Sequence, residues 1–260
     1  MARRPRRTEK QTRDLVMDAA VEHVSTNGLR ATPSLSMEDI IAAADVPRAT
    51  AYRLWPSREI FATDVLDRLA RGQSTPTLDL EAIETAVHAV AAEVTAGAEG
   101  IEIVGMLMGT IIEKEFDLLV DSHPWRAFLA YETALSSIPD PDQRARLLNR
   151  LAENEERTTH GIALLYGRVA AALGLRPRAE DSLLVAAQAS RVLARGLVND
   201  AVRETSTPQR RHADRRCLRE STCDLIRAAL DTEEGAGLPS SWPNDVITEI
   251  RAELDRAGFR

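Results

Sequence analysis

Apolar residues recur every three or four positions along most of the 260-residue chain. Strand-length stretches in which apolar and polar residues alternate are nearly absent, so the pattern predicts an all-α protein. In the larger, C-terminal part, helices are expected between turns that contain Gly, Pro or short polar runs. Their expected ranges are 79–96, 101–121, 124–136, 141–173, 178–204, 212–231 and 243–257.

The N-terminal quarter predicts a long helix followed by two short helices and a fourth of moderate length. The first is expected to stop at Asn27-Gly28, and Ser36 to cap the second, with Asp39 completing a capping box. Pro47 suits the first position of the third helix, and Ser57 is expected to cap the fourth. The expected ranges are about 9–26, 37–44, 48–55 and 57–71, followed by a domain boundary at 73–77.

Two helices of about seven residues that are joined by a tight turn need a third helix to bury their apolar faces. This arrangement is typical of the helix-turn-helix, whose second short helix enters the major groove of DNA. The side chains expected to face the groove are small, cationic or hydrogen-bonding: Arg48, Ala49, Thr50, Tyr52 and Arg53. Leu54 and Trp55 are expected to turn back into the core, and Arg58 to meet a phosphate at the start of the fourth helix.

The stretches 37–40 (Met-Glu-Asp-Ile) and 44–59 (Ala-Asp-Val-Pro-Arg-Ala-Thr-Ala-Tyr-Arg-Leu-Trp-Pro-Ser-Arg-Glu) resemble the DNA-binding domain of TetR-family transcriptional regulators. The resemblance covers about residues 10–71. It implies that Ser36 and Met37 approach a phosphate, and that Tyr52 binds a phosphate rather than a base. It also places Arg58 where the family usually has a phosphate-binding Lys.

The chain departs from the family pattern at three places. Asp45 stands where the family prefers Gly, although Asp tolerates a left-handed backbone better than most residues. Ile41 replaces a small residue, and the loop 32–35 looks longer than usual. These departures affect the expected docking angle on DNA rather than the motif.

Charge divides the chain into a basic end and an acidic body. Six basic residues lie within 1–13, opposed there only by Glu9, while the whole chain has a net charge of −7. We interpret residues 1–8 as a flexible basic arm that contacts DNA, with a merely solvated tail as the alternative. No signal peptide, membrane-spanning run or disulfide framework is expected, which favours a cytoplasmic protein.

The expected domains are the arm (1–8), the helix-turn-helix domain (9–72) and a larger helical domain (78–260). The resemblance implies that the larger domain binds a small-molecule effector and forms a homodimer, without a cofactor. A faint likeness to actinobacterial regulators of lactone-degrading, quorum-quenching genes suggests a small, largely apolar, lactone-like effector. The candidate pocket residues, each of which could equally be plain core, are Met106, Met108, Glu113, Phe116, His123, Trp125, Phe128, Tyr131, His160 and Tyr166.

Dimerisation is expected to use the helices near 178–204 and 212–231, because both carry broad apolar surfaces. The alternative is that these helices only cover the core of their own domain. The apolar residues are Leu183, Leu184, Ala187, Val192, Leu193 and Leu197 on the first helix, and Cys217, Leu218, Leu225, Ile226 and Leu230 on the second.

The chain is therefore expected to be a repressor that leaves a palindromic operator in double-stranded DNA when an effector binds. A DNA-binding protein without an effector is one alternative. A helical enzyme is another, but no nucleophile with a base, no phosphate loop and no metal-ligand pair is evident. The nearest approach to a metal site is Glu153, Glu156 and His160 on one helix face, which reads better as a solvated surface.

Overall fold

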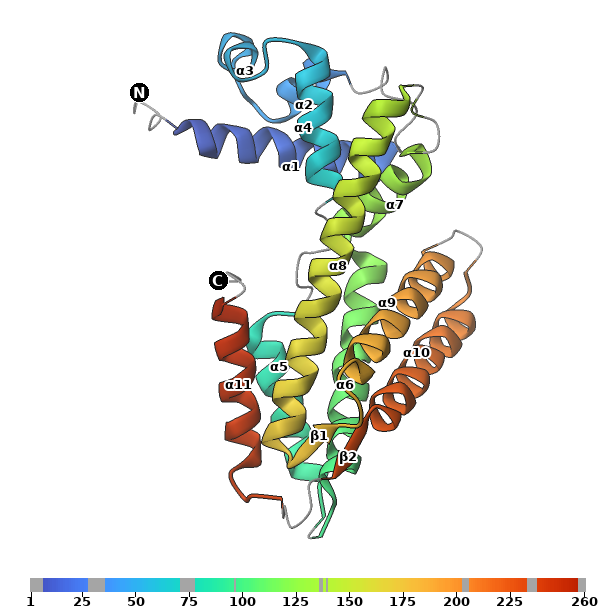
Figure 1. The fold of residues 1–260 in the computed structure, drawn as a ribbon. Coiled ribbons are helices and arrows are strands. Elements are labelled where there is room, and N and C mark those ends of the chain that lie inside the picture. Colours follow the sequence, from blue (N-terminus) through green and yellow to red (C-terminus); the bar gives the residue numbers. More distant parts are fainter. Residues whose placement is uncertain are drawn as a thin grey trace. The chain divides into compact units, whose positions relative to one another are not determined.

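The computed structural model describes residues 7–27, 36–70, 78–95, 97–135, 138, 140–202, 206–232 and 238–256. Residues 1–6 of the expected arm, the stop at Gly28, the loop 32–35 and the boundary at 73–77 lie outside them. Helices dominate the described chain, so the predicted all-α class is confirmed (Figure 1). The elements are α1 (Glu9–Asn27), α2 (Met37–Ala43), α3 (Arg48–Leu54), α4 (Arg58–Ala70), α5 (Leu80–Glu93), α6 (Gly100–Asp121), α7 (His123–Leu135), α8 (Pro141–Ala172), β1 (Leu175–Pro177), α9 (Ser182–Ala201), α10 (Pro208–Ala228), β2 (Leu230–Thr232) and α11 (Trp242–Arg256).

Helix α10 begins earlier than predicted, because a local capping signal precedes its apolar pattern. The Thr207 hydroxyl accepts a hydrogen bond from the Arg210 amide at 3.2 Å, and Pro208 occupies the first turn. Pro suits this position because its missing N–H would have no partner inside the helix. The apolar periodicity of the following residues starts only later, so it placed the start near residue 212.

Two short strands form at positions where the sequence predicted the end of a helix or a turn. β1 and β2 pair antiparallel, with Leu175 opposite Thr232 and Pro177 opposite Leu230. Leu175 and Leu230 are buried and belong to one hydrophobic core cluster, so both strands contribute to the core between the helices. Strands of three residues are too short to show an alternating pattern, which is why the sequence did not predict them.

The first of two compact units comprises Met1–Thr75 and Ser122–Asn154. Within its described residues, α1 contacts α2, α4 and α7, and α4 also contacts α7. Trp55 and Phe61 are fully buried, and their rings meet edge to face with centroids 5.5 Å apart. Aromatic pairs in this geometry add to the stabilisation that burial alone provides. The core of this unit therefore holds the two short helices α2 and α3 in place.

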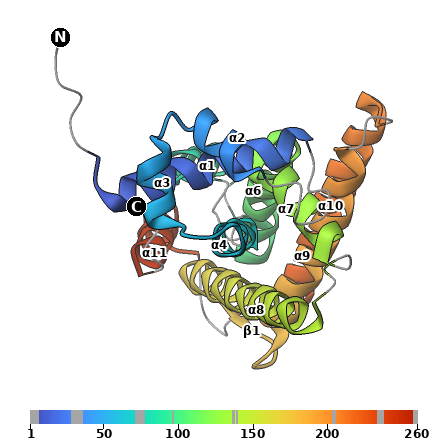
Figure 2. The same cartoon turned by 90° about the horizontal axis from the view of Figure 1, so that it is seen from above.

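The second unit comprises Pro76–Asp121 and Glu155–Arg260, and α6 forms its central helix. α6 contacts α5, α9 and α10, and α9 runs beside α10 (Figure 2). Ile103 and Leu107 of α6 are completely buried, and the thiol of Cys223 donates to the carbonyl oxygen of Gly105 at 3.1 Å. None of the helices in the described ranges is long and apolar enough to cross a membrane.

These units differ from the consecutive domains expected from the sequence. α7 and the first part of α8 join the N-terminal unit, although they follow α6 in the chain. The physical reason is the apolar face of α7, where Ala127, Phe128 and Tyr131 are fully buried in the unit that contains α1 and α4. Sequence order alone gives no sign that a later helix returns to an earlier unit.

Candidate nucleic-acid interface

The turn between α2 and α3 is built from local signals that the sequence displays. The Ser36 hydroxyl accepts from the Asp39 amide at 3.2 Å, which confirms the predicted cap of α2. Asp45 has φ +49°, so the expected left-handed turn residue is also confirmed. Pro47 is extended, with φ −60° and ψ 131°, and lies just before α3 rather than in its first turn. The Pro47 carbonyl oxygen accepts from the amides of Thr50 and Ala51, which starts the helix.

Helix α3 has one buried and one exposed face. Ala51 and Leu54 are buried, and Trp55, the residue that follows the helix, is completely buried. Trp55 and Leu54 are therefore core residues, as predicted. The opposite face consists of the exposed residues Arg48, Ala49, Tyr52 and Arg53, with Thr50 partly buried at its edge. Positions four apart on a helix lie on the same face, so these side chains form one continuous surface.

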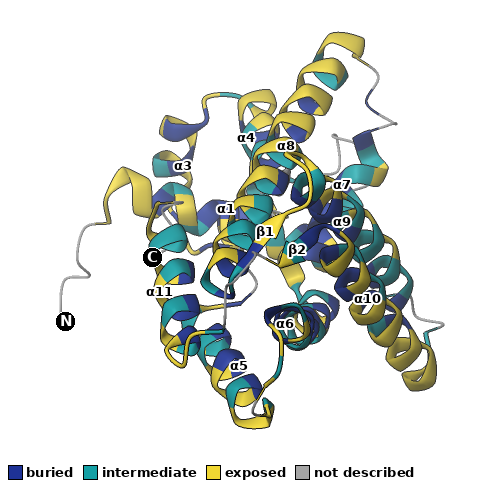
Figure 3. Cartoon of the chain, turned by 60° about the horizontal axis from the view of Figure 1, so that its bottom comes forward, coloured by how far each residue is buried: buried dark blue, intermediate teal, exposed yellow. Residues whose placement is uncertain are grey.

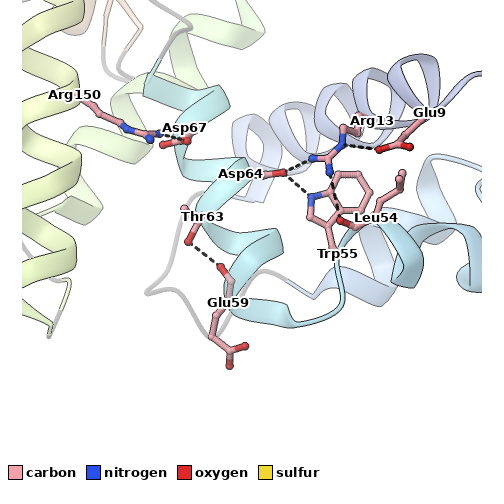
Figure 4. A network of polar contacts seen from close by, with 9 residues as sticks. All are labelled: Glu9, Arg13, Leu54, Trp55, Glu59, Thr63, Asp64, Asp67 and Arg150. Atoms are coloured by element: carbon pink, nitrogen blue, oxygen red, sulfur yellow. Dashed lines mark hydrogen bonds and ion pairs between the residues drawn. The ribbon is translucent and has the colours of Figure 1, made fainter.

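A partly buried polar contact fixes the end of α3 against the rest of the unit (Figure 4). The indole N–H of Trp55 donates to Asp64 Oδ2 at 2.8 Å, and Arg13 Nη1 approaches the same oxygen at 2.8 Å. The Arg13 guanidinium also lies over the Trp55 ring, 5.3 Å from its centroid. Arg13 is one of the six basic residues within 1–13, but its side chain is an internal partner of α4 and of Trp55.

A second polar contact links α4 to α8 within the same unit. Arg150 forms an ion pair with Asp67 Oδ2 (Figure 4). Burial raises the pKa of the Tyr131 phenol, and the negative charge of Asp67 adds to that increase. These contacts fix the helix that follows the Trp55 turn, and so support the position of α3.

Glu38 on α2 joins two of the predicted DNA-binding residues. Its Oε1 atom accepts from the Tyr52 hydroxyl at 3.0 Å and from Arg58 Nη2 at 2.7 Å. The Arg58 hydrogen bond is the largest cause that lowers the pKa of Glu38 to about 2, so Glu38 is a carboxylate at neutral pH. The same carboxylate raises the pKa of Tyr52, because the hydrogen bond stabilises the protonated form of the phenol. Sequence reasoning missed Glu38, since its partners lie 14 and 20 residues away.

The remaining predicted DNA contacts have different environments. Arg58 projects from the start of α4, and 72% of its side chain is exposed. Met37 is completely buried, so its side chain cannot reach DNA, and only its backbone amide is left for a phosphate. Ser36 is partly buried, with its hydroxyl engaged in capping α2.

The ten candidate effector residues are divided between the two units. His123, Trp125, Phe128 and Tyr131 belong to α7 in the first unit, where the three aromatic rings contact one another in sequence order. His123 is exposed, with Nδ1 lying 2.6 Å from Glu22. These four residues are core or surface of the first unit. The others lie in the second unit: Met106, Met108, Glu113, Phe116, His160 and Tyr166.

In the second unit, Met106, Glu113 and Tyr166 are partly buried, whereas Met108 and Phe116 are core residues. Burial raises the pKa of the Tyr166 phenol. His160 is exposed, and its Nδ1 atom lies 2.9 Å from the Glu156 carbonyl oxygen. Among the residues that the structure describes, no group of three or more His, Cys, Asp or Glu side chains is placed to hold a metal ion.

A polar group between α8 and α9 was not predicted. Arg191 donates to the Glu155 carbonyl oxygen at 2.8 Å and to the Thr159 hydroxyl, and Arg195 pairs with the Glu155 carboxylate. Burial lowers the pKa of the Arg191 guanidinium. These residues form a partly buried, charged cluster between α8 and α9.

The apolar residues expected to form the dimer interface differ in their exposure. On α10, Leu218 and Ile226 are buried against their own unit, as is Leu230 of β2, while the outer face is exposed and largely charged (Figure 3). On α9, Val192 is 68% exposed and Val185 is 56% exposed.

No protein-family model matches the chain, and no curated protein matches it in sequence. Several solved structures are similar. A TetR-family transcriptional regulator from Streptomyces coelicolor is 17% identical, with a TM-score of 0.48 over 84% of this chain and 95% of that one. GusR from Salmonella enterica is 20% identical, with a TM-score of 0.48 over 83% and 95%. The TetR-like regulator LfrR from Mycobacterium smegmatis, in complex with proflavine, is 18% identical, with a TM-score of 0.39 over 82% and 96%.

Proposed function

We propose that the chain is a DNA-binding transcriptional regulator of the TetR type, which works as a homodimer and responds to a small-molecule effector. The observation that carries the proposal is the exposed face of α3, formed by Arg48, Ala49, Tyr52 and Arg53. This face stands beside a capped α2 and a helix end anchored by Trp55. A short helix with a buried anchor and a cationic, hydrogen-bonding outer face suits insertion into a major groove.

The exposed residues have distinct roles in this proposal. Arg48 and Arg53 address guanine edges or phosphates, and the small Ala49 lets the helix backbone approach the groove floor. Tyr52 and Arg58 bind phosphates, which position the protein without reading sequence. In a dimer, two such helices meet successive major grooves about 34–36 Å apart, so a palindromic operator is expected.

For the homodimer, the exposed valines of α9 favour that helix as the apolar contact. Val185 and Val192 are seven residues apart and therefore lie on one face. The charged outer face of α10 fits the rim of such an interface better than its centre. Val192→Glu is expected to shift the protein from dimer to monomer in light scattering. Leu164→Glu, on another exposed apolar residue that belongs to α8, is expected to leave the dimer intact.

For the effector, the second unit is the proposed binding unit, and the partly buried residues Met106, Glu113 and Tyr166 support this choice. A ligand that binds one conformation of the dimer more tightly shifts the population toward it and thereby changes operator affinity. Repression with release by an apolar, lactone-like effector is the form of regulation that we propose. Screening small molecules by thermal stabilisation tests it, because a ligand of the native state raises the unfolding temperature.

The decisive experiment is a salt-dependent titration with duplex DNA from the region upstream of the protein's own gene. Tyr52→Ala and Arg53→Ala are each expected to weaken binding about tenfold, since a good DNA contact contributes about 1–3 kcal/mol. Arg68→Ala is the matched control, because Arg68 is an exposed cation of the same unit that pairs with Asp18 at 2.9 Å. Absence of binding to any duplex at low salt would overturn the proposed function.

A further inference from the structure

Glu38 accepts hydrogen bonds from Tyr52 and Arg58, the two side chains that the proposed function assigns to DNA phosphates. One oxygen of its carboxylate accepts from Tyr52 and Arg58 together, at 3.0 and 2.7 Å. A phenol and a guanidinium are also common donors to phosphate oxygens in protein–DNA complexes. The carboxylate therefore makes, within the protein, the kind of hydrogen bonds that a phosphate would make with these two groups.

The exposure of the three residues makes an exchange of partners feasible. The Arg58 side chain is 72% exposed and Tyr52 is 40% exposed, so both can reach a partner outside the protein. The Glu38 side chain is only 26% exposed and projects from the seven-residue helix α2. The Tyr52 hydroxyl has a single proton, so a phosphate that accepts it replaces Glu38 as the partner of Tyr52. Arg58 keeps further N–H donors beside the one that Glu38 engages, and a phosphate bound there lies next to a carboxylate of like charge.

We infer that Glu38 is an internal competitor of the DNA phosphate, which holds Tyr52 and Arg58 in the free protein and weakens binding to every duplex. This inference rests on the proposed function. Because phosphate contacts carry no sequence information, the weakening is the same factor for operator and for random DNA. Glu38 therefore sets the overall affinity of the interface, while the groove-facing residues of α3 set its sequence preference.

The test compares Glu38→Gln with wild type by titration against an operator duplex and a random duplex at fixed salt. Gln keeps the shape and an acceptor oxygen but removes the charge, and charge-assisted hydrogen bonds are about twice as strong as neutral ones. Glu38→Gln is expected to bind both duplexes roughly three- to tenfold more tightly. This range corresponds to the loss of an exposed ion pair with Arg58 and of the repulsion between the Glu38 carboxylate and the DNA phosphate.

Two further variants separate competition at Arg58 from a general gain in positive charge. Asp39→Asn makes the same change of net charge at the next, exposed residue of α2. Arg58→Gln removes one of the two groups for which Glu38 competes, so the effect of Glu38→Gln is expected to shrink markedly in that background. Far-UV circular dichroism and the unfolding temperature of each variant establish that the fold is retained, and Glu38→Ala serves as a second probe.

The outcomes distinguish the inference from the proposed function. Tighter binding of Glu38→Gln to both duplexes, much reduced in the Arg58→Gln background and absent in Asp39→Asn, supports the inference. Unchanged or weaker binding overturns it, as does an equal gain in Asp39→Asn. A gain confined to one sequence also overturns it, because Glu38 would then read a base. If neither wild type nor Glu38→Gln binds any duplex at low salt, the proposed function itself fails.

Discussion

The Trp55–Asp64 hydrogen bond provides a direct test of how α3 is held in place. Asp64→Ala removes the acceptor of an indole N–H that belongs to a completely buried side chain. A buried donor left without a partner costs about 1–3 kcal/mol. The same substitution breaks the 2.8 Å ion pair with Arg13, which is partly exposed and contributes about 0–1 kcal/mol. We therefore expect Asp64→Ala to lower the free energy of unfolding by about 1–4 kcal/mol.

The measurement is urea unfolding, followed by far-UV circular dichroism and tryptophan fluorescence. Asp64→Asn keeps an acceptor oxygen for the indole and is expected to lose only about 1 kcal/mol. Asp18→Ala is the surface control, since it removes an exposed partner of Arg68 and is expected to cost about 0.5 kcal/mol or less. A loss below about 0.5 kcal/mol for Asp64→Ala would refute the reasoning, because the buried N–H would then not need this acceptor.

The same variant has a consequence for function. Trp55 follows directly after α3, so a weakened anchor lets the end of that helix move. Asp64→Ala is therefore expected to weaken DNA binding, although Asp64 lies outside the exposed face of α3. Unchanged affinity in a destabilised variant would show that DNA binding itself restores the helix position.

Two further predictions concern a titration and a pair of glycines. Ultraviolet titration is expected to show the pKa of Tyr52 falling in Glu38→Gln, because the raised pKa of the phenol depends chiefly on its hydrogen bond to the Glu38 carboxylate. An unchanged pKa would contradict this hydrogen bond. Gly100→Ala is expected to destabilise by about 1–3 kcal/mol, because its added methyl group would overlap a backbone carbonyl oxygen of the turn after α8. Gly161→Ala meets nothing within 4 Å and is expected to stabilise α8 by about 0.5–1 kcal/mol, so thermal unfolding of the two variants should shift in opposite directions.

Much of the fold could be predicted from the sequence, because it depends on interactions between residues a few positions apart. The cap at Ser36, the left-handed turn at Asp45 and the burial of Trp55 each follow from residue type and from neighbours a few positions away. Helix periodicity likewise placed the eleven helices of the described residues close to their observed ranges. The exposed face of α3 was predictable for the same reason, since positions 48, 49, 52 and 53 share a face on any helix.

The candidate effector site could not be predicted in this way. Aromatic and Met residues at helical spacing look alike whether they line a pocket or fill a core. Trp125, Phe128 and Tyr131 belong to the core of the first unit, because α7 returns to pack against α1 and α4. That return depends on the mutual fit of apolar faces that are far apart in the chain.

The sequence by itself determined the helical class, the helix-turn-helix pattern and the residues that α3 exposes, because each depends on interactions within a few positions. Only the tertiary structure decided that Arg13 anchors Trp55 and that Glu38 holds Tyr52 and Arg58. Only the tertiary structure, too, decided that the apolar side of α10 faces its own unit. Contacts of this kind join residues 14 to more than 40 positions apart. Their partners are chosen by how whole helices pack, which no short stretch of sequence encodes.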